Sequence, residues 1–244
     1  MSMFKQPPGA ASLALRLSAT VMLALFLGYA TTSPPDAGAR QSTAAGDEAE
    51  PLRVVFLGDS ITAGYGLDRE QAYPALLQQR ADEAGLRIEM VNAGVSGDTT
   101  AGGLRRLDWV LGRGADVLVI ALGGNDGLRG LQPEQTQANL LATIEQAREK
   151  LPDVRIILAG MQMPANLGAR YVEQFAAVFP AVAEQAEVDL LPFLLDGVGG
   201  VAELNQDDQI HPNAAGQEAI ADLIWRTLRP LLQGDDGEPT PAAP

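Results

Sequence analysis

Residues 53–60 read RVVFLGDS. Gly58 ends an apolar run here, and an acid and a serine follow it at once. A continuous β-branched and apolar run of this length is typical of a strand that is buried on both faces. Further runs of the same kind follow along the chain and cover residues 88–92, 117–122, 155–159 and 188–191.

Stretches with the apolar spacing of helices lie between these predicted strands. They cover residues 70–84, 100–111, 133–151, 170–186 and 213–232. Strands that alternate with helices predict an α/β fold, in which a five-stranded parallel sheet is covered by helices on both faces. Ligands of such sheets bind beyond the carboxyl ends of the strands, so we expect functional residues in the turns that follow the strands.

Composition and charge exclude several classes of protein and one class of partner. The chain has 244 residues, of which 46% are hydrophobic and 20% charged, and these values exclude a disordered, collagen-like or coiled-coil protein. The formal charge is −14; residues 1–51 contribute −1 and residues 233–244 contribute −3, which leaves −10 for residues 52–232. A surface this acidic repels DNA and RNA, so no nucleic acid partner is expected.

Two residue types limit the chemistry further. The chain contains no cysteine, which excludes disulfides, thiolate zinc sites, a catalytic cysteine and a lipidated cysteine. His211 is the single histidine. A histidine-cluster metal site is therefore excluded, and a reaction that needs an imidazole has to use this residue.

Both ends of the chain differ in composition from its middle. Residues 1–30 combine positive charges, an apolar run at 17–27 and a small-x-small end, and they predict a cleaved signal peptide, with an uncleaved anchor as the alternative. Residues 31–51 predict a flexible linker, residues 52–232 the folded domain and residues 233–244 a disordered acidic tail. We therefore expect a periplasmic or secreted protein.

The turn after the first predicted strand carries Ser60. A serine at this place can present its hydroxyl to the crevice as a nucleophile, and capping of the next helix is the alternative role. A phosphate-binding loop is not indicated, because neither GxxxxGKS/T nor GxGxxG follows this strand.

Two further turns offer hydrogen-bond donors. Residues 92–99, NAGVSGDT, contain Gly97, which lets the backbone approach a ligand, and a plain tight turn is the alternative. Residues 123–127, GGNDG, contain Asn125, whose amide can point into the crevice, and a capping turn is the alternative.

The segment before the last predicted helix holds Asp208 and His211. Their spacing lets the carboxylate bind one imidazole nitrogen and leaves the other nitrogen free as a base. With Ser60 they supply the nucleophile, base and orienting acid of an acyl-transfer triad. The predicted oxyanion hole consists of the backbone N–H groups of Ser60 and Gly97 and the side-chain amide of Asn125.

The turns as a set resemble the conserved blocks of the GDSL or SGNH hydrolases. The blocks stand in the family's order at residues 58–60, 97, 123–126 and 208–211. Longer stretches are similar to the branch of periplasmic acyl-CoA thioesterases, arylesterases and lysophospholipases, namely residues 93–99, 122–130 and 163–166.

This resemblance implies a flavodoxin-like three-layer α/β/α sandwich that needs no cofactor and no metal. It implies activity on a broad range of medium to long acyl esters and thioesters, and a mobile substrate-binding segment at residues 128–133. Leu128, Leu131 and Met163 are the expected contacts of the acyl chain, and packing in the core is the alternative role of the methionine.

The acidic charge of the protein and its predicted export indicate which substrates are favoured. Coenzyme A is a polyanion of the cytosol, so a small-molecule or lipid acyl ester is favoured over acyl-CoA for an exported acidic protein. We expect a monomer that makes transient contact with membrane lipid. Two rival functions remain: a carbohydrate O-acetyl esterase, for which the 5% aromatic content is low, and a non-catalytic binding module, against which the intact residue set argues.

Overall fold

The computed structural model describes residues 50–232. The predicted signal peptide and acidic tail, and most of the predicted linker, lie outside these residues. Five strands form one parallel sheet in the order β2-β1-β3-β4-β5, as the sequence predicts. They are β1 (Leu52–Gly58), β2 (Ile88–Gly94), β3 (Val117–Ala121), β4 (Arg155–Ala159) and β5 (Asp189–Leu191).

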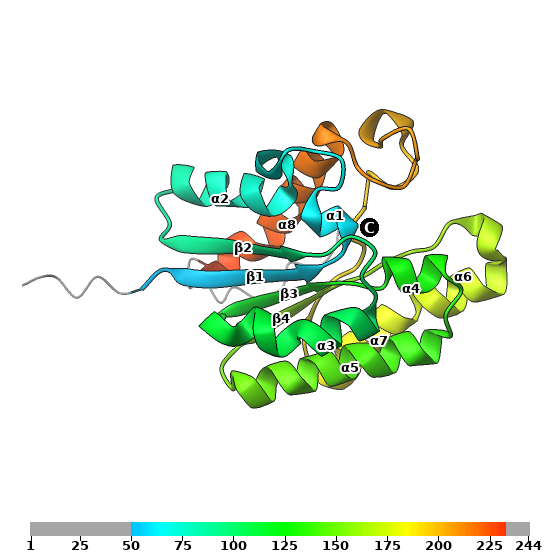
Figure 1. Cartoon of the computed structure of the whole chain (residues 1–244), viewed down its shortest axis with the longest axis horizontal. Helices are drawn as coiled ribbons and strands as arrows, with labels where there is room; N and C mark the ends of the chain where they lie inside the picture. The colour runs from blue at the N-terminus through cyan, green and yellow to red at the C-terminus, as the bar shows by residue number, and fades with distance from the viewer. Residues whose placement is uncertain (1–49, 233–244) are drawn as a thin grey trace, which may run out of the picture. The chain divides into compact units, whose positions relative to one another are not determined.

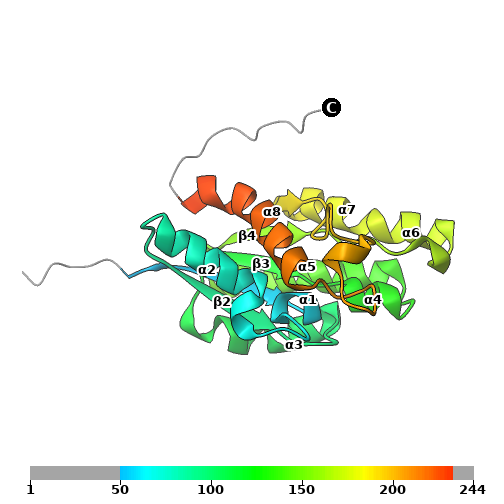
Figure 2. The same cartoon turned by 90° about the horizontal axis from the view of Figure 1, so that it is seen from above.

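Helices cover both faces of the sheet. The α-helices are α1 (Ser60–Ala63), α2 (Tyr73–Glu83), α3 (Thr100–Val110), α4 (Gly124–Leu128), α5 (Pro133–Lys150), α6 (Ala169–Ala176), α7 (Val178–Ala186) and α8 (Ala214–Leu232). Short 3-10 segments are η1 (Arg69–Gln71), η2 (Leu111–Arg113), η3 (Ala165–Leu167) and η4 (Ala202–Leu204). Helices α2 and α8 lie on one face, and α3, α5 and α7 lie on the other (Figures 1 and 2). The domain is thus the expected three-layer α/β/α sandwich.

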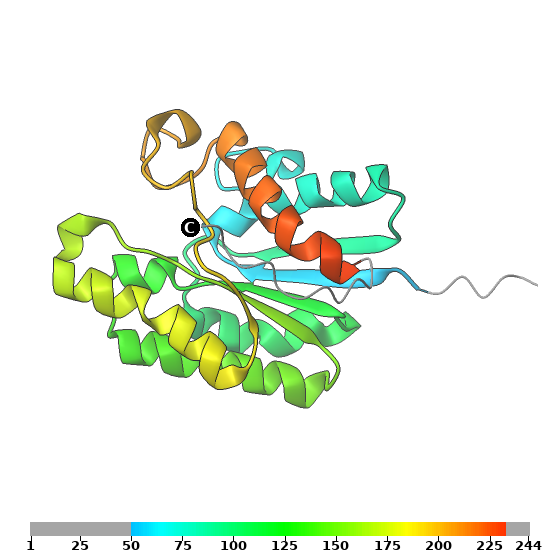
Figure 3. The same ribbon diagram turned by 180° about the vertical axis from the view of Figure 1, so that it is seen from behind.

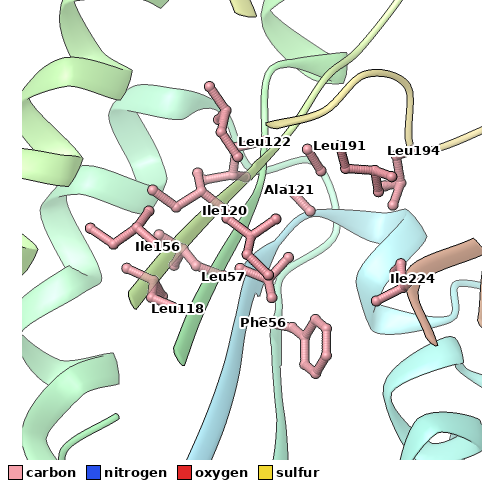
Figure 4. Close-up of a cluster of buried hydrophobic side chains, with 14 of the residues drawn as sticks. Phe56, Leu57, Leu118, Ile120, Ala121, Leu122, Ile156, Leu191, Leu194 and Ile224 are labelled. Atoms are coloured by element: carbon pink, nitrogen blue, oxygen red, sulfur yellow. The ribbon is translucent and has the colours of Figure 1, made fainter. Parts of the chain in front are cut away.

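The core lies between these layers. Side chains from the central strands and from α8 form one apolar cluster, in which Phe56, Leu118 and Ile120 have no exposed surface (Figure 4). Complete burial of a side chain of this size stabilises a fold by about 1.5–3 kcal/mol. The apolar runs that predicted the strands are therefore the residues that hold the three layers together.

The structure differs from the prediction at two helices. The stretch predicted as one helix at 170–186 is divided at Ala177, because Pro180 has no N–H to donate to the carbonyl of residue 176. The helix predicted at 70–84 starts as η1 and becomes α-helical at Tyr73, after Ala72 in an extended conformation. Pro74 then lies in the first helical turn, where its missing N–H costs nothing.

The strand register brings three functional turns together. Gly58 at the end of β1 pairs with Gly94 of β2 on one side and with Ala121 of β3 on the other. A Cβ atom on Gly94 would lie 2.4 Å from the backbone nitrogen of Ala63, so only glycine lets α1 approach β2 this closely. The segment between β5 and α8, gold to orange in Figure 3, reaches the same end of the sheet.

A buried glutamine fixes α1 relative to the long helices. The side-chain Oε1 of Gln217 on α8 accepts a 2.9 Å hydrogen bond from the N–H of Tyr73, and its Nε2 donates a 3.0 Å bond to the carbonyl of Ile61. Gln217 is 1% exposed, so water cannot replace either bond. This one side chain connects α8, α2 and the short helix that carries Ser60.

We predict that Gln217→Leu lowers the free energy of unfolding by about 2–4 kcal/mol, because it leaves two buried backbone groups without their side-chain partner. Urea denaturation measures this change. Gln185→Leu on the exposed surface of α7 is the control and should change the free energy by less than about 0.5 kcal/mol. Equal stability of the two variants would show that the Gln217 bridge contributes nothing.

Candidate active site

Ser60 is the first residue of α1 and is almost buried, directly after the end of β1. Asp59 precedes it as the N-cap, and its Oδ1 accepts a 3.0 Å hydrogen bond from the N–H of Ile61. The first N–H groups of a helix have no partner within the helix. The sequence therefore places the hydroxyl and the backbone N–H of Ser60 at the helix end that favours negative charge.

Ser60 and His211 lie within hydrogen-bond distance although 151 residues separate them. The distance from Ser60 Oγ to His211 Nε2 is 2.9 Å, and that from His211 Nδ1 to Asp208 Oδ2 is 2.6 Å. With the Nδ1 proton on the Asp208 side, Nε2 is free to accept the hydroxyl proton of Ser60. The three residues singled out from two distant blocks of the sequence form one continuous chain of hydrogen bonds.

A tight turn brings Asp208 back onto His211. Oδ1 of Asp208 accepts 2.9 Å hydrogen bonds from the N–H groups of Ile210 and His211. Gln209, the residue directly after Asp208, has a left-handed φ of 58°. The backbone bond from His211, the side-chain bond from His211 and the backbone bond from Ile210 lower the pKa of Asp208 to about 2. Asp208 is thus a carboxylate at every pH at which the domain would act.

The predicted oxyanion donors lie in the turns next to Ser60. Gly97 has a φ of 79°, a conformation that favours glycine, and its carbonyl accepts a 2.8 Å bond from Arg129 Nη2. Asn125 is the second residue of α4, after Gly123 with a φ of 119°. Its side-chain nitrogen donates a 3.1 Å bond to Oδ2 of Asp59, and this bond fixes which way the amide faces.

The pKa of Asp59 is unusually high for an aspartate. Burial raises its pKa to about 6, although the hydrogen bonds from Ile61 and Asn125 and the proximity of His211 act in the opposite direction. In the sequence, an aspartate directly before a helix indicates no more than an N-cap. The structure adds a second role, because the same carboxylate holds the amide of Asn125.

Arg106 on α3 is a further residue that the sequence did not reveal. Its guanidinium donates to Asp98 Oδ2 at 2.7 Å, to the carbonyl of Ala93 at 2.7 Å and to the carbonyl of Gly58 at 2.9 Å. It therefore joins the ends of β1 and β2 to the turn that carries Gly97. Long-range contacts of this kind leave no local pattern, and only the fold discloses them.

Asp126, next to Asn125, is fully buried and has a structural task. Its carboxylate accepts hydrogen bonds from the backbone N–H and the hydroxyl of Thr100. These bonds attach the start of α4 to the start of α3. The polar side chain of α4 that reaches Asp59 is that of Asn125.

An apolar pocket of about 330 Å³ opens beside Ser60. Two of the expected acyl-chain contacts, Leu128 and Met163, line it, whereas Leu131 does not belong to its lining. The pocket is also lined by Ile61, Gly124, Met161, Gln162, Pro164, Phe193, Leu195, Gly199, Gly200, Asn205, Gln209 and Ile210. Ile61 follows the serine and Ile210 precedes the histidine, so the pocket borders the segments that carry Ser60 and His211, although neither of these two residues lines it.

Neither a metal-binding cluster nor a membrane-spanning helix is found among residues 50–232. Within residues 50–232, no cluster of three or more histidine, cysteine, aspartate or glutamate side chains could hold a metal ion. Over the same residues, no helix has the length and apolar character needed to cross a bilayer.

Known proteins that are similar in sequence to this chain are esterases and acylhydrolases. The model of the GDSL-like lipase/acylhydrolase family matches residues 56–219. The chain is 46% identical to "Esterase TesA" of Pseudomonas aeruginosa over 76% of this chain and 92% of that protein. It is 40% identical to "Thioesterase 1/protease 1/lysophospholipase L1" of Escherichia coli (75% and 86% covered) and 36% identical to "Arylesterase" of Vibrio mimicus (72% and 88% covered).

Solved structures agree with this result. The crystal structure of TesA superimposes with a TM-score of 0.70 at 46% identity, and covers 74% of this chain and 99% of its own. An esterase of the SGNH-hydrolase family has a TM-score of 0.62 at 36% identity, with 78% and 99% covered.

We predict that Asp59 contributes to the acid side of the pH profile. Protonation of this carboxyl removes the charge that strengthens its hydrogen bonds from Ile61 and Asn125, so its hold on the Asn125 amide weakens as the pH falls through about 6. A histidine base must also be neutral to act. The logarithm of kcat/KM for an uncharged ester should therefore fall with a slope greater than about 1.

In Asp59→Asn this slope should return to about 1. Activity at pH 8 should drop about ten-fold, because the new amide cannot hold the Asn125 nitrogen as a carboxylate does. Asp153→Asn, an exposed acid at the far end of the sheet, is the control. A slope of one in the unmodified protein, unchanged in Asp59→Asn, would exclude Asp59 from this role.

Proposed function

The chain belongs to the GDSL-like lipase/acylhydrolase family and is a carboxylic ester hydrolase, and we propose that Ser60, His211 and Asp208 carry out its reaction. One observation carries this proposal: the hydrogen bonds of 2.9 Å and 2.6 Å that connect the three side chains in series. A serine hydroxyl is a weak nucleophile, and a base within hydrogen-bond reach is what activates it.

The first half of the reaction acylates the serine. As Oγ of Ser60 attacks the ester carbonyl carbon, its proton moves to Nε2 of His211. The carbonyl oxygen becomes an oxyanion, to which the N–H groups of Ser60 and Gly97 and the amide of Asn125 donate. When the tetrahedral intermediate collapses, the bond to the leaving group breaks and His211 returns the proton to the departing alcohol or thiol.

The second half repeats these steps with water as the nucleophile. His211 takes a proton from the water that attacks the acyl-serine, and it then protonates Oγ of Ser60 as the carboxylic acid leaves. Asp208 stays ionised throughout because its pKa is lowered to about 2, so it stabilises the imidazolium that forms twice in each cycle. Removal of one oxyanion donor typically raises such a barrier by about 3–4 kcal/mol.

The apolar pocket supports an acyl chain as the part of the substrate that enters the protein. Leu128 and Met163 contribute apolar walls, and the pocket adjoins the serine through Ile61. The charge of −10 on residues 52–232 disfavours the polyanionic coenzyme A, so esters of medium to long fatty acids, lysophospholipids among them, are the proposed substrates. We further propose that the protein acts as a monomer and contacts membrane lipid transiently.

Covalent labelling tests the nucleophile. An alkyl fluorophosphonate should add one phosphonyl group to the protein and none to Ser60→Ala, as intact-protein mass spectrometry would show. Hydrolysis of a chromogenic acyl ester should fall at least about 1000-fold in Ser60→Ala. Ser96→Ala, the exposed serine of the next turn, is the matched control and should retain the label. A labelled and active Ser60→Ala would contradict the assignment.

Export is proposed from the sequence of residues 1–30 and is tested separately. If the signal is cleaved, the protein recovered from the periplasm or medium of a producing bacterium begins near Thr31. Amino-terminal sequencing of that protein decides the question. An intact Met1 or Ser2 on a membrane-bound product would favour the anchor instead.

A further inference from the structure

A tyrosine ring lies directly against the histidine of the hydrogen-bonded chain. The ring centroids of Tyr65 and His211 are 4.6 Å apart, with 39° between the ring planes. Tyr65 nevertheless remains 52% exposed, so one large aromatic side chain borders both His211 and the solvent. Exposure of this size beside buried Ser60 leaves ring surface free for another molecule.

The backbone of Tyr65 is held by both catalytic segments. Its N–H donates a 3.0 Å bond to the carbonyl of Ser60, and its carbonyl accepts a 2.7 Å bond from Gln206 Nε2. The backbone N–H of Gln206 in turn donates to the carbonyl of His211 at 2.8 Å. The backbone that carries the ring is therefore fixed relative to the nucleophile and to the base at once, and the ring itself contacts His211.

Two glycines flank Tyr65 and determine the course of the backbone there. Gly64 and Gly66 have φ values of 71° and 78°, which residues with side chains rarely adopt. A Cβ on Gly66 would also lie 2.5 Å from Oε1 of Gln206. The chain thus turns sharply on both sides of Tyr65, whose side chain lies half exposed at the surface.

The ring lies on the alcohol side of the ester. His211 protonates the leaving group, so the leaving group has to pass beside this imidazole and hence beside Tyr65. The acyl pocket has different walls, among them Ile61, Leu128 and Met163, and neither Tyr65 nor Gln206 belongs to its lining. The two halves of an ester therefore meet different surfaces of this site.

We propose that the exposed surface of Tyr65 is a leaving-group subsite that binds the flat aromatic alcohol of a phenolic ester by stacking. Aromatic rings attract one another in offset or tilted arrangements beyond what their contact area alone provides. An aromatic leaving group adds a third ring to the Tyr65–His211 pair. This inference rests on the proposed function, because it takes His211 as the residue that protonates the leaving group.

Two esters with one acyl chain test the subsite. Phenyl butyrate and cyclohexyl butyrate have leaving groups of similar size, of which only the first is flat and aromatic. In Tyr65→Leu, kcat/KM for the phenyl ester should fall about 3- to 10-fold, and that for the cyclohexyl ester less than about 2-fold. Tyr65→Phe keeps the ring and should resemble the unmodified protein with both esters.

Comparison of variants on the same ester removes the difference in chemical reactivity between the two alcohols. Trp109→Leu, which removes the 82% exposed indole of α3, is the control and should leave both values unchanged. The pH profile is recorded for each variant, because a ring that acted only by orienting His211 would shift the acid side of that profile.

Three outcomes would overturn the subsite. An equal loss for both esters with a shifted pH profile would assign Tyr65 to the positioning of His211. An equal loss with an unshifted profile, or no loss for either ester, would show that the ring does not distinguish aromatic alcohols. Failure of the proposed function would look different, since fluorophosphonate would then leave Ser60 of the unmodified protein unlabelled.

Discussion

The hydrogen bond between Ser60 and His211 is the contact on which the rest of the site depends. It joins the end of the first strand to a segment that lies 151 residues later in the chain. Neither partner is held by the bond alone. Gln217 attaches α8 to α1, and Asn205 secures the approach to His211 by donating to the carbonyls of Val198 and Val201. The geometry of one proton transfer thus requires the docking of the whole C-terminal helix.

Two aspartates near this hydrogen bond show how the environment sets the behaviour of a carboxyl group. Asp208 is partly exposed and receives three hydrogen bonds within its own turn, so its pKa falls to about 2. Asp59 is 2% exposed, and burial raises its pKa to about 6. Because the pKa of Asp59 in the folded state lies above its ordinary value of 3.8, this group favours folding below about pH 4, and that contribution, on the order of 3 kcal/mol, is lost as the pH rises through about 6.

The fold and the three residues of the Ser60–His211–Asp208 hydrogen-bonded chain were predictable from the sequence, whereas the groups that surround this chain were not. Continuous apolar runs revealed the strands because burial on both faces excludes polar residues, and the turns after them followed from the rule for parallel sheets. The break at Ala177 escaped the prediction because an apolar period persists across Pro180. Arg106 and Tyr65 escaped it because the contacts that matter most, with the carbonyl of Gly58 and with the ring of His211, are remote in sequence and leave no local signal.

The division of the site between separate chain segments has a consequence for specificity. The apolar pocket proposed for the acyl chain is built from residues of α1 and α4 and of the segments after β4 and β5, whereas the ring proposed to bind the leaving group comes from the loop between α1 and η1. In the proposed reaction, only Ser60 and His211 have to contact both parts of the ester. Neither Leu128 nor Met163 is a hydrogen-bond partner of Tyr65, so substitutions of these two pocket residues leave the hydrogen bonds of Tyr65 in place, and Tyr65 itself does not line the pocket. The same two catalytic groups can then serve esters whose acid and alcohol are selected independently.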